Sequence, residues 1–256
     1  MRSKLGQNFL INQNIAKKIS ESLNDNEIII EIGPGEGALT KFLYEKFSDH
    51  LFLIEIDKNF IQDLNLRFPR AKIICQDVLQ VDFEKLSERK KINVIGNLPY
   101  CISTEILFLI HRYRDYVDEV VCMLQKEVVA RVCANNCCKQ YGIPSVLLQS
   151  FFAVEKMLDV GPENFSPEPK VFSSVLRMKR NDIKKLNCNE ELFNKVVHCA
   201  FQCRRKILKN ALGSFVGKNF ESEKLNLRAE QLSVSDFVFL TNEIDSFFGK
   251  NLSAGG

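Results

Sequence analysis

The feature that most constrains the fold is a repeated alternation of short apolar runs with segments of helical periodicity. The run Ile28–Ile32 is rich in β-branched residues and ends at the glycine turn 33–37, as a buried strand does. Further strands are expected at residues 51–56, Lys72–Cys75, 92–95 and 119–124, with helices at 38–47, 58–68, 103–114 and 126–134. This alternation predicts an α/β domain with a parallel sheet covered on both faces, which binds ligands at the carboxyl ends of its strands.

Two further segments complete this domain. An amphipathic helix capped by Asn12 or Asn14 precedes the first strand. Strand-like stretches at 151–160 and 171–179 flank the proline-rich loop 161–169 and predict an antiparallel edge. A polar stretch follows Arg180, and the remaining sequence has helical signals only. We therefore expect a domain at 1–180 and a small all-helical domain at 181–256.

Composition indicates an ordinary globular protein. The 256 residues are 45% hydrophobic and 26% charged, and no apolar run approaches the roughly 18 residues needed to cross a bilayer. No secretory signal is evident, and nine cysteines, an odd number, favour a reducing compartment, so we expect a cytoplasmic protein with no membrane association. Cys133, Cys137 and Cys138 lack the paired spacing of zinc ligands, so we expect no metal. The net charge of +3 does not by itself indicate a polyanionic partner.

The turn after the first strand favours a particular kind of cofactor. Gly33, Gly35 and Gly37 have the spacing G-x-G-x-G, whereas dinucleotide sites have G-x-G-x-x-G and hold a pyrophosphate. Glu31 and Glu36 would oppose a pyrophosphate but suit a ligand with an ammonium and a sulfonium. S-adenosylmethionine carries both groups.

Two acids, one at the end of the second strand and one after the third, support this interpretation. Glu55 lies 22 residues after Gly33, where a carboxylate accepts hydrogen bonds from ribose hydroxyls. Asp77 follows the third strand and is placed to accept from an adenine amine. Either acid alone is more simply a surface residue at a strand end, but the three features in this order predict a nucleotide-type pocket.

The tetrapeptide after the fourth strand is the candidate catalytic loop. An adenine amine is a weak nucleophile, so it needs acceptors for its N–H bonds, and Asn97 Oδ1 and the Leu98 carbonyl are suitable. Pro99 restricts the conformation of Leu98, and Tyr100 offers a ring on which a base can stack. An ordinary Asn/Pro turn is the commoner origin of such a tetrapeptide, but its position after an α/β strand favours the catalytic interpretation.

RNA contacts are predicted in two places. A helix over about 190–212 carries basic residues with no acid among them, at Arg204, Arg205, Lys206 and Lys209. A merely solvated face explains this run equally well. Phe165 lies in a loop of three prolines, where burial is less easy than elsewhere, and we expect it to stack on a base.

Ordered motifs along nearly the whole chain resemble the ribosomal RNA adenine dimethyltransferase family, and its small-subunit branch in particular. They are GQNFL at 6–10, EIGPGEGALT at 31–40, IEID at 54–57, NLPY at 97–100, MLQKEVVARV at 123–132, YG-x-x-SV at 141–146, F-x-P-x-PKV at 165–171, AF-x-x-RRK at 200–206 and RAEQLS at 228–233. The resemblance implies a Rossmann-like class I methyltransferase domain that uses S-adenosylmethionine. It also implies dimethylation of two adjacent adenosines near the 3′ end of small-subunit (16S) rRNA, with a role in late assembly of the small subunit.

Site residues and partners follow from the same resemblance. It places Tyr100 and Phe165 on either side of the target adenine, and the cofactor among Gln7, Asn8, Leu10, Gly33, Glu55, Asp77 and Asn97. The expected partner is small-subunit rRNA or an immature 30S particle, and we expect a monomer. The chain departs from the family pattern at Cys101, Glu105 and Phe172, where Asn, Pro and Asp are common, which puts local loop packing in doubt.

Three alternatives stay open. A large-subunit rRNA methyltransferase that confers antibiotic resistance shares the chemistry, although the GPG turn and the RAEQLS segment resemble the small-subunit branch. A binding module of the mitochondrial-transcription-factor kind keeps the fold without catalysis. A nicotinamide oxidoreductase is disfavoured by the glycine spacing.

Overall fold

The protein divides into two compact units. A computed structural model describes residues 7–217 and 219–253. Its first unit runs to Val129 and resumes over Phe152–Arg180, and its second unit comprises Ala130–Phe151 and the described residues from Asn181 onward. The chain therefore crosses between the units three times, since residues 130–151 group with the C-terminal helices.

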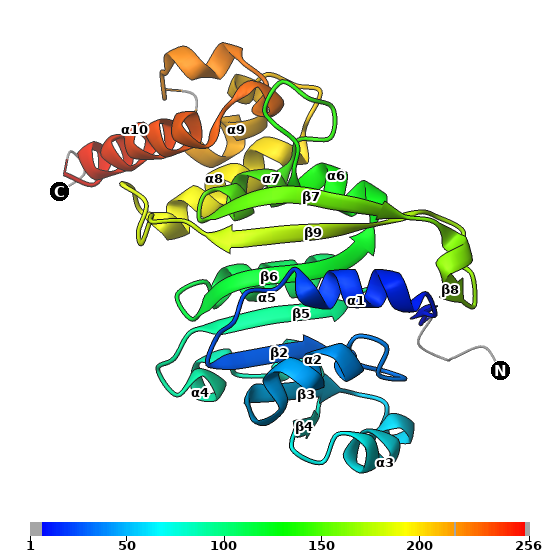
Figure 1. The fold of residues 1–256 in the computed structure, drawn as a ribbon. Helices are drawn as coiled ribbons and strands as arrows, with labels where there is room; N and C mark the ends of the chain where they lie inside the picture. Colours follow the sequence, from blue (N-terminus) through cyan, green and yellow to red (C-terminus); the bar gives the residue numbers. More distant parts are fainter. Residues whose placement is uncertain (1–6, 218, 254–256) are drawn as a thin grey trace. The chain divides into compact units, whose positions relative to one another are not determined.

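A seven-stranded sheet forms the centre of the first unit (Figure 1). In spatial order its strands are β4 (Lys72–Cys75), β3 (Leu51–Glu55), β2 (Ile28–Ile32), β5 (Ile92–Asn97), β6 (Val117–Gln125), β9 (Ser173–Arg180) and β7 (Phe152–Val160). The five strands from β4 to β6 are parallel, while β9 is antiparallel to both β6 and β7. This confirms the predicted α/β class with an antiparallel edge.

Helices cover the sheet in the way that its apolar pattern requires. They are α1 (Gln13–Glu21), α2 (Thr40–Phe47), α3 (Lys58–Arg67), α4 (Phe83–Ser87), α5 (Ser103–Arg112) and α6 (Lys126–Val132), of which α6 spans the boundary between the units. In the view of Figure 1, α1 and α2 lie in front of the sheet and α5 behind it. Because both faces are covered, β2 is buried at all five positions, as its β-branched run predicts.

One hydrophobic core joins α1 and α2 to the sheet. Ala16 and Ile19 of α1 and Leu43 of α2 pack in one cluster with inward residues of β2, β3, β6 and β9. Asn12 is the N-cap of α1, and its side chain accepts hydrogen bonds from the backbone N–H groups of Asn14 and Ile15. The lead-in helix is thus fixed on the sheet.

A second, two-stranded sheet attaches the N-terminal segment to the proline-rich loop. Strand β1 (Phe9–Leu10) pairs antiparallel with β8 (Phe165–Ser166). Beyond it, Ile11 N donates to Asn164 O at 2.9 Å, and Asn12 Nδ2 donates to Asn164 Oδ1 at 2.8 Å. Strands of two residues carry too little pattern to be recognised in a sequence, and neither was predicted.

The second unit is built from helices. They are α7 (Ile143–Gln149), α8 (Glu190–Gln202), α9 (Leu208–Val216) and α10 (Val234–Ser253). The prediction of one continuous helix over about 190–212 is wrong, because the chain turns at residues 203–206 between α8 and α9. Within this unit Ile207 forms a β-bridge with Arg228, which holds the break. The aromatic rings of Tyr141, Phe201 and Phe237 pack in its core.

No helix among residues 7–217 and 219–253 has both the length and the apolar character required of a membrane span.

Candidate active site and cofactor pocket

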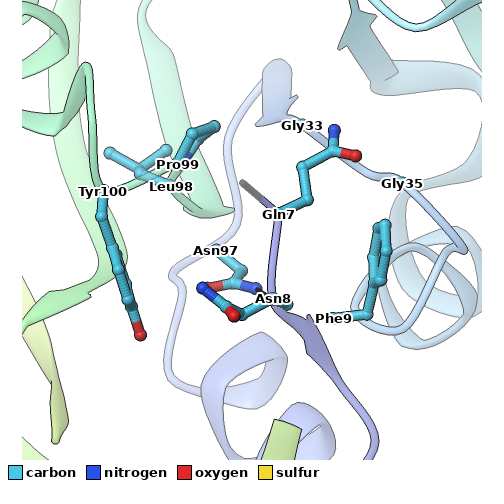
Figure 2. Close-up of a pocket in the computed structure, with 9 residues that line it drawn as sticks. All are labelled: Gln7, Asn8, Phe9, Gly33, Gly35, Asn97, Leu98, Pro99 and Tyr100. Atoms are coloured by element: carbon cyan, nitrogen blue, oxygen red, sulfur yellow. Dashed lines mark hydrogen bonds between the residues drawn. The ribbon is translucent and has the colours of Figure 1, made fainter. Parts of the chain in front are cut away.

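A pocket lies at the carboxyl ends of β2 and β5, where the predicted motifs converge (Figure 2). It is lined by the N-terminal segment, the glycine turn and the candidate catalytic loop. The lining residues are Gln7, Asn8, Phe9, Gly33, Gly35, Asn97, Leu98, Pro99 and Tyr100. Figure 2 shows Asn97 and Asn8 next to one another, with the rings of Tyr100 and Phe9 on either side of them.

A second pocket adjoins the first, since both are lined by Gln7, Gly33 and Pro99. Its other lining residues are Ile32, Ile54, Glu55, Ile56, Gln76, Asp77, Val78, Leu79, Cys101 and Ile102. The cavity has a volume of about 180 Å³. The walls are largely aliphatic with two carboxylates at strand ends, a composition suited to a base and its ribose.

The glycine turn contributes to the walls of both pockets, since Gly33 lines both and Gly35 lines the first. Gly33 N donates to Ile54 O at 2.9 Å, which fixes the start of the turn against β3. Gly35 has φ +51°, and a Cβ on it would lie 2.9 Å from the Phe9 ring. A side chain is therefore excluded at Gly35, because positive φ and the ring both forbid it.

Glu55 is a buried carboxylate whose orientation is fixed by backbone donors. Its Oε2 accepts from Gly35 N at 3.0 Å and its Oε1 from Asp57 N at 2.9 Å, and the residue is 2% exposed. Each oxygen keeps a second lone pair for a ligand hydroxyl. Asp77 is held similarly, since its Oδ1 accepts from Leu79 N at 2.9 Å.

Glu31 is a buried residue of β2, next to the last position of the strand, and it lines neither pocket. Burial raises its pKa to about 8; the nearby Thr40 hydroxyl lowers this pKa and the charge of Glu55 raises it. Among the described residues, no group donates to Glu31 Oε2 at hydrogen-bonding geometry. At neutral pH such a carboxyl keeps its proton when no cation is near. A cation placed beside it favours the ionised form.

The buried Glu31 predicts a pH dependence of stability. Its pKa in the unfolded chain is near 4.5 and in the folded protein about 8, so between these values the unfolded state alone loses the proton. The free energy of unfolding should therefore fall as pH rises through this window, by up to about 1.4 kcal/mol per pH unit. Urea denaturation at pH values from 5 to 9 measures this free energy of unfolding. Glu31→Gln should abolish this decline, and equal slopes in both proteins would contradict the assignment.

Hydrogen bonds on three sides hold the loop from Asn97 to Tyr100. Asn97 Nδ2 donates to Asn8 O at 2.8 Å, and among the described residues no group donates to Asn97 Oδ1. Leu98 N donates to Met123 O at 3.1 Å, and the Tyr100 hydroxyl lies 2.6 Å from Ser173 Oγ. Partial burial raises the pKa of Tyr100, while Ser173 lowers it. The loop thus presents an amide oxygen with no donor in the described residues beside a half-buried aromatic ring.

Gly96 is a structural requirement that the sequence analysis missed. A Cβ on Gly96 would lie 2.5 Å from the carbonyl oxygen of Ile32, so only glycine lets β5 approach β2 this closely. This approach sets Asn97 beside the glycine turn. A glycine inside an otherwise apolar strand was the available signal.

The sequence analysis also missed Ile56, an aliphatic residue of the second pocket whose side chain is 52% exposed.

The structure does not support the predicted position of Phe165. Its side chain is 2% exposed and packs in the core cluster with Leu10, its partner in the β1–β8 pair. The expectation that three prolines keep this ring out of the core is wrong, because strand pairing with β1 covers it. The ring has no open face for a base here. Leu10 and Gly37 are also buried and line neither pocket.

The basic residues of the second unit are not equivalent. Arg204 Nη2 donates to Lys139 O at 2.6 Å and Tyr141 O at 3.0 Å, and pairs with Glu230 at 3.3 Å. It therefore joins three segments of its own unit and pairs with an acid that lies outside the basic run in the sequence. All four basic residues are exposed, so Arg204 differs from Arg205, Lys206 and Lys209 by its contacts and not by its burial.

No cluster of three or more His, Cys, Asp or Glu side chains with metal-binding geometry occurs in the part of the chain that the structure describes.

Comparisons with known proteins agree with these features. The model of the family described as "Ribosomal RNA adenine dimethylase" matches residues 1–246. A protein of Cytophaga hutchinsonii named "Ribosomal RNA small subunit methyltransferase A" is 44% identical, covering 94% of this chain and 96% of its own. A Flavobacterium johnsoniae protein of the same name is 41% identical, with 96% of each chain covered.

Solved structures share the fold. A dimethyladenosine transferase from Plasmodium falciparum superimposes with a TM-score of 0.78 at 22% identity, covering 93% of this chain and 98% of that one. The 23S rRNA methyltransferase ErmE gives a TM-score of 0.68 at 19% identity, covering 93% of this chain and 100% of that one. The match extends over both units of the chain.

Proposed function

Because the chain belongs to the ribosomal RNA adenine dimethylase family, we propose that it dimethylates the exocyclic amines of two adjacent adenosines near the 3′ end of 16S rRNA, using S-adenosylmethionine. The observation that carries this proposal is the position of Asn97. Its side chain lines the pocket that adjoins the one with Glu55 and Asp77, and hydrogen bonding to Asn8 fixes its amide. A methyl acceptor at Asn97 would therefore lie next to the cofactor.

The described residues fit the cofactor. Glu55 would accept from the ribose hydroxyls with its remaining lone pairs, and Asp77 from the adenine amine, while Ile56 and Val78 enclose the base. Glu31 lines neither pocket and its buried carboxyl has a raised pKa, so it would become negatively charged only if the ammonium end came close to it. Gln7, Asn8, Gly33 and Gly35 complete the walls. S-adenosylmethionine supplies the transferable methyl group.

The catalytic loop would act on the nucleophile. Asn97 Oδ1 and the Leu98 carbonyl accept hydrogen bonds from the adenine amine, which draws its lone pair out of conjugation with the ring. Asn97 keeps its Oδ1 in place because Nδ2 is bound to Asn8 O. Tyr100 provides a surface for the base, and Pro99 limits the conformations of the Leu98 carbonyl. A neutral acceptor pair leaves no unpaired anion beside the cofactor.

We assign the C-terminal helical unit to the binding of rRNA or an immature 30S particle, as a monomer in the cytoplasm. Its exposed Arg205, Lys206 and Lys209 are available for phosphates. Arg204, by contrast, links Lys139, Tyr141 and Glu230 within the unit and supports its fold.

This difference gives a matched pair of variants. Combined replacement of Arg205 and Lys206 by alanine should weaken binding several-fold for RNA of any sequence. It should also reduce the magnitude of the slope of the logarithm of the binding constant against the logarithm of the salt concentration by about 2. Arg204→Ala should instead lower the thermal unfolding midpoint, because three contacts are lost. Binding titrations at several salt concentrations, with calorimetry, separate the two effects. An unchanged salt slope in the double variant would remove these residues from the RNA interface.

The function is tested by incubating the protein with labelled S-adenosylmethionine and undermethylated small subunits, then mapping the labelled base. We expect label on the exocyclic amines of two adjacent adenosines near the 3′ end. Isolated large subunits serve as the control for the alternative substrate. Label on large-subunit rRNA only, or no label on either, would overturn the proposal.

A further inference from the structure

Phe172 is an exposed aromatic residue that directly precedes Ser173, a contact of the catalytic loop. Its side chain is 55% exposed, and Lys126 Nζ lies 5.7 Å from the ring centroid. We propose that Phe172 is a stacking platform for a nucleotide adjacent to the target adenosine. This inference rests on the proposed function, because it concerns the same RNA substrate.

The strand register places Phe172 at the same edge as the catalytic loop. Strand β9 begins at Ser173, which pairs with Gln125 at the carboxyl end of β6, and Asn97 pairs with Met123 on that same strand. Ser173 Oγ also lies 2.6 Å from the Tyr100 hydroxyl. Phe172 is thus one residue from a direct contact of the catalytic loop. An RNA strand that delivers a base to Tyr100 passes this edge.

The backbone at Phe172 is fixed while its ring stays in solvent. Phe172 O accepts a hydrogen bond from Lys126 N at 2.9 Å, and the next residue, Ser173, is fully buried. A ring that is held in place and still exposed loses little conformational freedom when a base stacks on it. Lys126 lies over the ring, and its contact is a cation–π interaction.

The charged residues around the Phe172 ring favour base stacking on the ring over attraction of RNA phosphates as the source of affinity. Lys126 and Lys156 share the carboxylate of Asp159, at 2.8 and 3.3 Å. The exposed Lys170 lies two residues after the exposed Glu168, and the exposed Glu127 directly follows Lys126. Because cations and anions are nearly balanced, the ring itself would supply the affinity, and its contribution should depend little on salt.

A protein partner fits this surface less well. The only exposed large apolar neighbour in the described sequence around Phe172 is Val171, at 43% exposure. One ring and one valine form too small an apolar surface for a stable protein interface, which buries about 800 Å² on each partner. The stacking of a single base on the Phe172 ring needs no larger apolar surface.

The test compares Phe172→Leu, Phe172→Ala and Phe172→Trp with the unmodified protein. We measure kcat and KM on undermethylated small subunits, the Kd of a protein-free RNA fragment from the 3′ end of the small-subunit rRNA, and the Kd of S-adenosylmethionine. The leucine and alanine variants should raise KM and the RNA Kd about tenfold, at low and at high salt, whereas tryptophan should retain wild-type values. The values of kcat and cofactor Kd should stay unchanged.

Three results would overturn the inference while leaving the function intact. Wild-type KM in the leucine variant would mean that an aromatic face is not needed. A loss in kcat alone would mean that Phe172 acts through the position of Tyr100. A loss on subunits with unchanged binding of the free RNA fragment would indicate a protein contact. Failure of the proposed function itself is distinguishable, because the unmodified protein would then not methylate small subunits at all.

Discussion

Replacement of Asn97 by alanine should lower kcat by about 10²- to 10³-fold, the range seen when one preorganised polar group is removed from an active site. The variant loses the Oδ1 acceptor that prepares the amine for attack. Cofactor affinity should change only several-fold, because Glu55 and Asp77 lie in the adjoining pocket and are unaffected. Single-turnover methylation of small subunits and a cofactor titration measure the two quantities.

Asn93 on the same strand is the matched control. It is buried, its Oδ1 accepts from Asn26 Nδ2 at 3.0 Å, and its Nδ2 donates to Asn24 O at 3.0 Å. It lies near the opposite end of β5, so Asn93→Ala should reduce stability by about 1–3 kcal/mol without lowering kcat. Full turnover in Asn97→Ala, or an equal loss in both variants, would contradict the role of Asn97.

Replacement of Glu55 by glutamine should weaken cofactor binding by about 10²-fold. Glutamine has nearly the same shape, but only one of its two terminal atoms accepts hydrogen bonds. Its amide NH2 group would face the N–H of either Gly35 or Asp57, and the remaining contacts lose their ionic character. Calorimetric titration with S-adenosylmethionine gives the affinity.

Glu119 offers a control of equal burial. It is fully buried and accepts from Asn24 N at 2.9 Å and from Arg177 Nε at 2.6 Å, remote from both pockets. Glu119→Gln should lower stability and leave cofactor affinity unchanged. If Glu55→Gln bound the cofactor as tightly as Glu119→Gln, Glu55 would have no part in the cofactor site.

Features encoded by residues close together in sequence were predictable. The β-branched run of β2 specifies a buried strand whatever its neighbours are, and the Asn12 cap depends only on N–H groups two and three residues later. The glycine turn, Glu55 at the end of β3 and Asp77 after β4 converge because parallel strands end at a common edge. The α/β class and most of the pocket walls follow from these local signals.

Features that depend on distant partners were not predictable. Phe165 is buried because β8 pairs with β1, more than 150 residues earlier in the chain. The break between α8 and α9 accompanies contacts of Arg204 with Lys139, Tyr141 and Glu230, none of them near it in sequence. The need for glycine at position 96 comes from the Ile32 carbonyl on a neighbouring strand. In each case composition and periodicity carry no information about the partner.

The pairing of β1 with β8 also has a consequence for how the protein matures. Phe9 and Leu10 precede most of the first unit in the chain, whereas Phe165 and Ser166 are synthesised only after most of that unit has been made. Gln7 and Asn8, which immediately precede this pair, cannot take their final places until then. A nascent chain released before residue 166 should have most of its parallel sheet and yet be unable to retain its cofactor.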